Sequence, residues 1–137
     1  MQMGAQRGVN YRKSDWSTSL KEFTGGNGFD LIVDSAGGPG FQELIDLVKP
    51  GGKIVTYGAT AGTPGDINLR KVFWNQIRIQ GTTMGSPEDF LKMINFVSSK
   101  KINPVIHAVY GLSDYLKAYE EMEKGLQFGK IVLKIAE

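Results

Sequence analysis

The 137 residues are 41% hydrophobic and 22% charged, and sixteen Lys and Arg against fourteen Asp and Glu leave a net charge of +2. This length fits one domain, and the scattered basic residues exclude a nucleic-acid partner, which would need them gathered on one face. Since the chain has no Cys and one His, a disulfide framework, a thiolate nucleophile and a Cys-ligated zinc are excluded. Residues 1–8 lack the apolar run of a signal peptide. We therefore expect a cytoplasmic protein with no membrane partner.

The first expected elements are a short strand at residues 9–11 and the helix that follows it. Ser14 is the expected N-cap of this helix, and Trp16, Leu20 and Phe23 share one face at helical spacing. We expect Trp16 to lie in the core rather than to serve as a platform for a ligand.

A β-α-β unit is expected next. Residues 29–33 and 53–57 are short apolar runs bounded by Gly, a pattern typical of parallel strands that are buried on both faces. Between them the apolar positions from Phe41 to Val48 follow helical spacing, and the sequence at 50–52, Pro-Gly-Gly, ends the pattern.

Two more strands and three more helices are expected downstream. A helix at 72–76, with Phe73 and Trp74 expected in the core, leads to a strand at 77–81. Ser86 is the expected N-cap of the next helix, with Pro at its first position and acidic residues after it. The last helix is expected to begin at Ser113 and to end at Gly125. The last strand is expected at residues 130–135.

Alternating strands and helices with short connections predict an open parallel α/β sheet with right-handed crossovers. Ligands of such sheets bind beyond the carboxyl ends of the strands. Two of the turns at that edge, residues 34–38 and 58–62, are rich in small residues, which let a backbone approach a flat ligand such as a nucleotide. The same composition is equally typical of tight turns, so both interpretations stay open here.

Several sequence signals of nucleotide or catalytic sites fail. Gly38-Pro39-Gly40 begins a G-x-G-x-x-G pattern, but Glu43 replaces its third Gly. Residues 124–131 approach a phosphate loop but place Lys at its first Gly position and Ile at its Ser/Thr position. Asp30 and Asp34 share a face of one strand, yet roughly 13 Å of strand separates them, which is too far for paired acid-base work. We expect His107 to have a surface or packing role and residues 120–124 to form a solvated helix face.

The order of several segments carries a family resemblance. These segments are Val9-Asn10-Tyr11-Arg12, Gly28 to Asp34, Lys49 to Gly58, Ile79 to Ser86 and Gly129 to Leu133. In this order they resemble the medium-chain dehydrogenase/reductase family, and most of all its zinc-type alcohol dehydrogenases and quinone oxidoreductases. The resemblance implies that residues 1–137 are the carboxy-terminal portion of an NAD(P)-binding Rossmann-like domain whose first β-α-β unit is missing. It also implies that residues 86–137 return toward an absent catalytic domain.

The resemblance further implies where NAD(P)H would bind. Asn10 and Tyr11 would lie near the adenosine ribose, with Tyr11 able to bond a 2′-phosphate, and Ser35 and Ala36 would line the adenosine side. The nicotinamide side would meet backbone groups of the turns after the next two strands, at Tyr57, Gly58, Ala59, Thr82 and Met84. The Gly-rich phosphate turn, zinc ligands and catalytic residues have no counterpart in the sequence. We therefore expect weak or absent cofactor binding, no zinc and no activity in the isolated chain.

Two alternatives for function stay open. One is a non-catalytic module that binds a nucleotide or oligomerises. Another is an S-adenosylmethionine-dependent methyltransferase, in which a buried Asp-containing strand is also followed by Lys-Pro-Gly-Gly, although such enzymes end in an antiparallel hairpin. For association we expect a homodimer or larger assembly through a sheet edge, either at 77–81 or beside 29–33.

Overall fold

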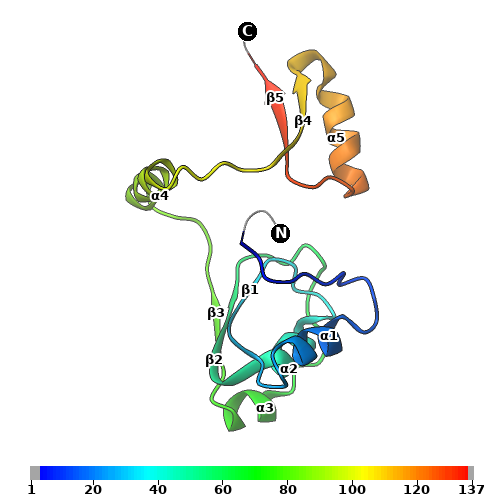
Figure 1. Ribbon diagram of the computed structural model, residues 1–137, viewed down its shortest axis with the longest axis vertical. Helices are drawn as coiled ribbons and strands as arrows, with labels where there is room; N and C mark the ends of the chain where they lie inside the picture. The colour runs from blue at the N-terminus through cyan, green and yellow to red at the C-terminus, as the bar shows by residue number, and fades with distance from the viewer. Residues whose placement is uncertain (1–3, 136–137) are drawn as a thin grey trace. The chain divides into compact units, whose positions relative to one another are not determined.

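The computed structural model describes residues 4–135, and these divide into two compact units with the boundary between Met84 and Gly85 (Figure 1). The first unit contains α1 (Trp16–Phe23), β1 (Phe29–Asp34), α2 (Phe41–Leu47), β2 (Val48–Thr56), α3 (Leu69–Trp74) and β3 (Arg78–Gly81). The second contains α4 (Pro87–Ser99), β4 (Ile106–Gly111), the 3-10 turn η1 (Leu112–Asp114), α5 (Tyr115–Lys124) and β5 (Lys130–Lys134).

The sheet of the first unit is parallel, in the order β1-β2-β3. Val33 pairs with Val55 across the β1-β2 ladder, and Val55 pairs with Gln80 across the β2-β3 ladder. The predicted parallel α/β architecture is therefore confirmed. The register between β1 and β2 shifts after Phe29, where β2 begins at Val48 before the Pro-Gly-Gly sequence. The predicted helix consequently ends at Leu47 rather than continuing through Val48.

The core of the first unit lies between the sheet and α2. Phe41 and Ile45 of α2 pack with Ile54 of β2 and with Ile77, and Ile45 and Ile54 are fully buried. The predicted apolar face of this helix is thus confirmed. Helix α1 packs against α2 (Figure 1).

The other face of β1 departs from expectation. Leu31 and Val33 alternate with the inward-facing Ile32, and they are 54% and 62% exposed. The prediction that this strand is buried on both faces is therefore wrong for the described residues, because no described element covers that side. Phe73 and Trp74 of α3 are also exposed rather than core, since Val72 is the residue of this short helix that packs inward.

The segment before α1 is not the predicted strand. Asn10 instead organises a turn, in which its carbonyl accepts from Lys13 N at 3.0 Å and its Oδ1 accepts from Arg12 N at 3.0 Å. An Asn side chain that bonds nearby backbone in this way competes directly with strand pairing. The helix begins one residue later than predicted, after Asp15 rather than Ser14, and Asp15 makes no side-chain cap bond.

Most predicted boundaries hold in the second unit. Ser86 caps α4 in a reciprocal capping box with Asp89, and Pro87 is the first helical residue, as predicted. Gly125 ends α5 in the left-handed conformation, also as predicted. One expectation needs correction, because α5 opens at Tyr115 after the turn η1 rather than at Ser113. Residues 106–111 form β4, an unpredicted strand that pairs in parallel with β5.

Among the helices of residues 4–135, none combines the length and the apolar character that a membrane crossing would require.

Candidate functional site

The turns after β1 and β2 interlock through their backbones. Gly38 N donates to Gly62 O at 2.8 Å, and Ala61 N donates to Ala36 O at 2.8 Å. Tyr57 N reaches Asp34 O at 3.0 Å and continues the strand ladder into the turns. These bonds hold the two small-residue turns together at the carboxyl edge of the sheet, where open parallel sheets place their ligands.

The small residues of these turns are required by this packing. A Cβ atom on Gly58 would lie 2.5 Å from Ser35 O, and one on Gly38 would lie 2.7 Å from Ala61 O. Gly38 also has a φ of +70°, which a residue with a side chain rarely adopts. Packing between the turns therefore explains part of the glycine pattern, whether or not a ligand binds.

Asp34 fixes the first turn. Its carboxylate accepts from Ala36 N at 3.2 Å and Gly37 N at 2.9 Å, and from Thr56 Oγ1 at 3.3 Å. Asp30 has a different partner, the ammonium of Lys49 at 3.0 Å. The two carboxylates thus have separate structural roles, and neither is arranged to act with the other on a substrate.

A cavity of about 580 Å³ lies beside the first turn. Of the predicted adenosine-side residues, Tyr11, Ser35 and Ala36 all line it. Trp16 lies in the same wall and is half-buried, so the prediction that it lies in the core is wrong. The wall also contains Glu43, whose Oε2 atom is buried without a hydrogen-bond partner among the described residues. This volume is within the range of small-molecule sites.

A second hollow, of about 520 Å³, lies at the carboxyl ends of β2 and β3. It is lined by four of the residues predicted on the nicotinamide side, namely Tyr57, Gly58, Ala59 and Thr82. Asn10 instead lines a separate hollow of about 240 Å³. Met84 lines neither of the two larger hollows; it is 94% exposed and has a φ of +45°. Contact of any of these residues with a cofactor stays a prediction.

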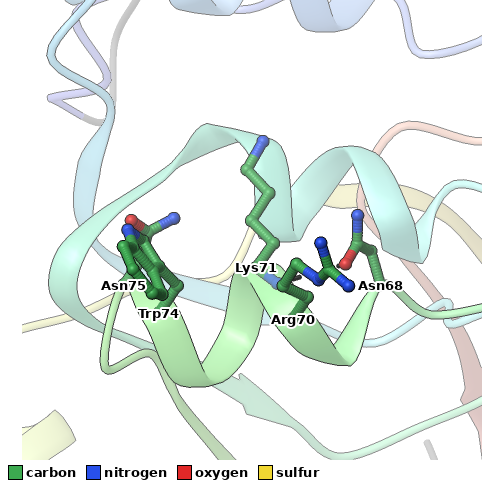
Figure 2. A pocket seen from close by; sticks show the side chains of 5 residues that line it. All are labelled: Asn68, Arg70, Lys71, Trp74 and Asn75. Atoms are coloured by element: carbon green, nitrogen blue, oxygen red, sulfur yellow. Dashed lines mark hydrogen bonds between the residues drawn. The ribbon is translucent and has the colours of Figure 1, made fainter.

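Sequence reasoning missed a further hollow of about 450 Å³ on α3 (Figure 2). Figure 2 shows Trp74 and Asn75 at one end of the helix, Arg70 and Asn68 at the other, and Lys71 pointing away between them. The ammonium of Lys71 pairs with Asp46 of α2 at 2.6 Å, and Asn68 accepts from Lys71 N at 3.1 Å as the N-cap. These contacts fasten α3 to α2 and leave the hollow as an open groove on the helix surface.

The second unit contains a polar cluster that joins β4 to α5. His107 Nε2 lies 2.8 Å from Glu121 Oε1, and the hydroxyl of Tyr110 donates to Glu121 Oε2. The hydrogen bonds from Tyr110 and then His107 lower the pKa of Glu121, and the bond to Glu121 raises the pKa of Tyr110. The predicted solvated face at 120–124 therefore needs correction at Glu121, whose side chain is 28% exposed. No periodicity signal marks this cluster, because its members are distant in sequence.

The described residues do not fit a zinc ion. In residues 4–135 no group of three or more His, Asp or Glu side chains is arranged to hold a metal. His107 has one carboxylate neighbour, Glu121, whose other oxygen already accepts from Tyr110. A zinc site of the usual four nitrogen and sulfur ligands cannot be assembled from this set.

Comparison with known proteins identifies the family to which the chain belongs. A family model described as zinc-binding dehydrogenase matches residues 3–133. A zinc-type alcohol dehydrogenase-like protein, YogA of Leptosphaeria maculans, is 33% identical over 98% of this chain and 39% of its own length. An L-threonine 3-dehydrogenase of Deinococcus radiodurans is 30% identical over 96% of this chain and 38% of its own length. The chain thus spans about two fifths of the length of these relatives.

Solved structures support the same assignment. The crystal structure of an NAD-dependent alcohol dehydrogenase matches with a TM-score of 0.87 and 33% identity, covering 98% of this chain and 39% of the other. A quinone oxidoreductase of Pseudomonas syringae shares the fold, with a TM-score of 0.76 and 22% identity over 98% of this chain and 44% of the other. A methyltransferase would be expected to have an antiparallel hairpin, whereas β2 and β3 pair in parallel here. The predicted resemblance is confirmed: the chain belongs to the zinc-binding dehydrogenase family.

Proposed function

We propose that this chain is the cofactor-binding part of an NAD(P)H-dependent oxidoreductase of the alcohol dehydrogenase or quinone/enone reductase type. One observation carries the proposal. Two hollows of nucleotide-site size open at the carboxyl ends of β1, β2 and β3, against turns that their own hydrogen bonds hold in place. Turns fixed before binding lower the ordering cost of a ligand.

The adenosine part of the cofactor is assigned to the cavity of Tyr11, Ser35 and Ala36. The hydroxyls of Tyr11 and Ser35 would bond the ribose there, and the apolar faces of Val33 and Trp16 would contact the flat base. The nicotinamide part is assigned to the hollow beside Gly58 and Thr82. When bound, the nicotinamide ring supplies the hydride transfer, and the protein supplies binding and orientation.

We further propose that activity requires parts equivalent to the remainder of the longer relatives, so that the isolated chain is inactive. The exposed Leu31 and Val33 support this proposal, because parallel sheets are ordinarily covered on both faces. The donor set does not fit zinc, so no step of the reaction is assigned to that metal. The residues that bind the substrate are assigned to the parts of the longer relatives that this chain does not match.

A second candidate is a non-catalytic module that binds a nucleotide or oligomerises. The observation that favours it is the pair of edge strands, β1 and β3, that the three-stranded sheet presents. Unpaired edges recruit further chains. Under this alternative the nucleotide hollows are retained but no enzyme is completed.

Both candidates are tested by NMR titration of the 137-residue chain with NADH, NADPH and S-adenosylmethionine at millimolar concentration. We expect NADH or NADPH to shift the amide signals of residues 33–37 and 57–59, and S-adenosylmethionine to leave them in place. Ala36→Leu, which fills the first cavity, should abolish the shifts at 33–37, whereas Ala5→Leu at an exposed position should not. Absence of any shift with both dinucleotides contradicts the assignment of these hollows.

Enzymatic activity separates the two candidates. The chain is combined with the complementary part of a relative, expressed as a separate polypeptide, and NADH oxidation is followed with enone and quinone substrates. Activity of the mixture that neither part shows alone supports the oxidoreductase. Nucleotide binding without activity in any such mixture supports the non-catalytic module.

A further inference from the structure

The link between α5 and β5 contacts the one histidine of the sequence. Residues 126–129 connect the two elements, and among the described contacts the amide of Phe128 donates to His107 Nδ1 at 3.4 Å. The ends of the link are fixed by other bonds: Gly125 N donates to Met122 O at 3.1 Å, and Lys130 N donates to Val105 O at 2.8 Å. Between these ends, the described residues hold the link through the hydrogen bond from Phe128 N to the imidazole and through the half-buried Gln127.

These contacts define the tautomer of His107. A backbone N–H can only donate, so Nδ1 must carry a lone pair to accept from Phe128. The neutral ring then has its proton on Nε2, which faces Glu121 Oε1 at 2.8 Å and donates to it. Tyr110 occupies the other oxygen of Glu121 as a donor, so the carboxylate accepts from both sides.

Protonation of His107 would affect its two contacts in opposite directions. A proton on Nδ1 would face the N–H of Phe128, so that two donors would oppose each other and that bond would be lost. The contact between Nε2 and Glu121 would become a charge-assisted hydrogen bond and would strengthen. The connection between β4 and α5 would persist while the link at 126–129 was released.

We propose that His107 is a proton-controlled latch that holds residues 126–129 when neutral and releases them when protonated. Leu126 and Phe128, which the link displays at 76% and 78% exposure, then gain freedom to move. Gln127 Oε1, buried without a donor among the described residues, provides no competing attachment through that atom.

Charged and ionisable side chains lie near His107 on α5, β4 and β5. Glu121 and Lys124 lie on α5, and Tyr110 lies on the same strand as His107. Lys130 lies on β5 and pairs with Ile106, the residue before His107. Glu121 is the carboxylate that contacts the ring, with its Oε1 atom 2.8 Å from His107 Nε2. Because His107 is the one histidine of the sequence, the imidazole signals in an NMR spectrum can be assigned to it.

Hydrogen exchange of the 137-residue chain, measured residue by residue by NMR, tests the latch. After correction for intrinsic exchange, the protection of the Phe128 amide should fall by about threefold to tenfold between pH 7.5 and 5.5, the change expected for loss of one hydrogen bond. The amide of Lys130, which bonds Val105, is the internal reference and should keep its protection. A parallel fall at both amides indicates general loosening and overturns the proposal, as does constant protection of Phe128.

Two substitutions separate the ring nitrogens. His107→Asn places an acceptor near the Nδ1 position without a titrating group, so protection of Phe128 should persist at both pH values. His107→Gln places its amide nearer the Nε2 position, so protection of Phe128 should be low at both. If His107→Asn retains the pH dependence of the unaltered chain, a group other than His107 is responsible and the latch is refuted.

Discussion

Gly58 lies against the carbonyl of Ser35 so closely that a Cβ atom at position 58 would sit 2.5 Å from that oxygen. The neighbouring atom is backbone and cannot rotate away. A substitution at Gly58 must therefore displace one of the two turns that form the candidate nucleotide site.

We expect Gly58→Ala to lower the free energy of unfolding by about 1–3 kcal/mol, the usual cost of forcing extra volume into a packed site. Urea denaturation followed by circular dichroism measures this loss. Gly65→Ala is the matched control, because a Cβ atom there meets nothing within 4 Å, and its effect should stay within about 0.5 kcal/mol. Equal stability of the two variants would show that the turns do not interlock as described.

The capping box of α4 predicts a helix that depends on its first turn. Ser86→Ala removes the acceptor for Asp89 N and should destabilise α4 by about 1 kcal/mol. Helix α4 contributes no residue to the buried core of the described chain, so tertiary packing offers little compensation. The amide protection of residues 88–92 is the measurement, and Ser98→Ala near the other end is the control. Unchanged protection in Ser86→Ala would contradict the importance of the cap.

The cluster around Glu121 predicts that the stability of the fold decreases at acidic pH. Its pKa is lowered, chiefly by the hydrogen bond from Tyr110 and then by that from His107. A group whose pKa is lower in the folded state stabilises the fold above its ordinary pKa of 4.5, and this stability is lost as the pH falls through the lowered value. Tyr110→Phe removes the main cause, so the pKa of Glu121 should rise toward the ordinary value. Carbon-13 NMR of the Glu121 carboxyl measures the shift, and an unchanged pKa in this variant would exclude the proposed bond as its cause.

Cofactor affinity gives a further prediction. We expect the isolated chain to bind NADPH only weakly, so that millimolar concentrations are needed, because the sequence contains no complete G-x-G-x-x-G turn to hold the pyrophosphate at a helix N-terminus. Isothermal titration calorimetry measures this affinity. A submicromolar Kd would show that the hollows beside Ser35 and Gly58 suffice for tight binding.

The edges of the sheet predict association. β1 and β3 are the outer strands of the first unit, and open edges pair readily with other chains. We expect sedimentation equilibrium to show a dimer or larger species at concentrations on the order of tens of micromolar. Val33→Lys on β1 and Ile79→Lys on β3 introduce charge beside one edge each, and the variant that becomes monomeric identifies the associating edge. A monomer in the unaltered chain would contradict this prediction.

Local signals in the sequence were sufficient wherever a segment's structure depends on its own residues. Ser86, Pro87 and Asp89 predict the start of α4 because the whole capping box lies within four consecutive positions. The apolar face of α2 was predictable for the same reason. Composition and segment order also identified the parallel sheet and the two turns that line the hollows.

Most errors occur where a segment depends on distant partners. Asn10 is an exception, because its turn is local and its side chain bonds nearby backbone in a segment whose residues favour a strand. Leu31 and Val33 have the composition of a strand buried on both faces, yet exposure depends on which layers cover the sheet. Glu121 seemed one member of a solvated run because its partner His107 lies fourteen positions away. Pattern reasoning also could not divide the glycines between turn packing and ligand approach.

The reciprocal bonds between the turns after β1 and β2 have a consequence for how this edge of the protein can change over evolution. Because Gly38 bonds Gly62 while Ala61 bonds Ala36, neither turn can gain or lose a residue without misaligning the other. Insertions that an ordinary surface loop would tolerate are therefore excluded here. Variation at this edge should consist of paired exchanges between the two turns at constant length, with new loops introduced elsewhere on the chain.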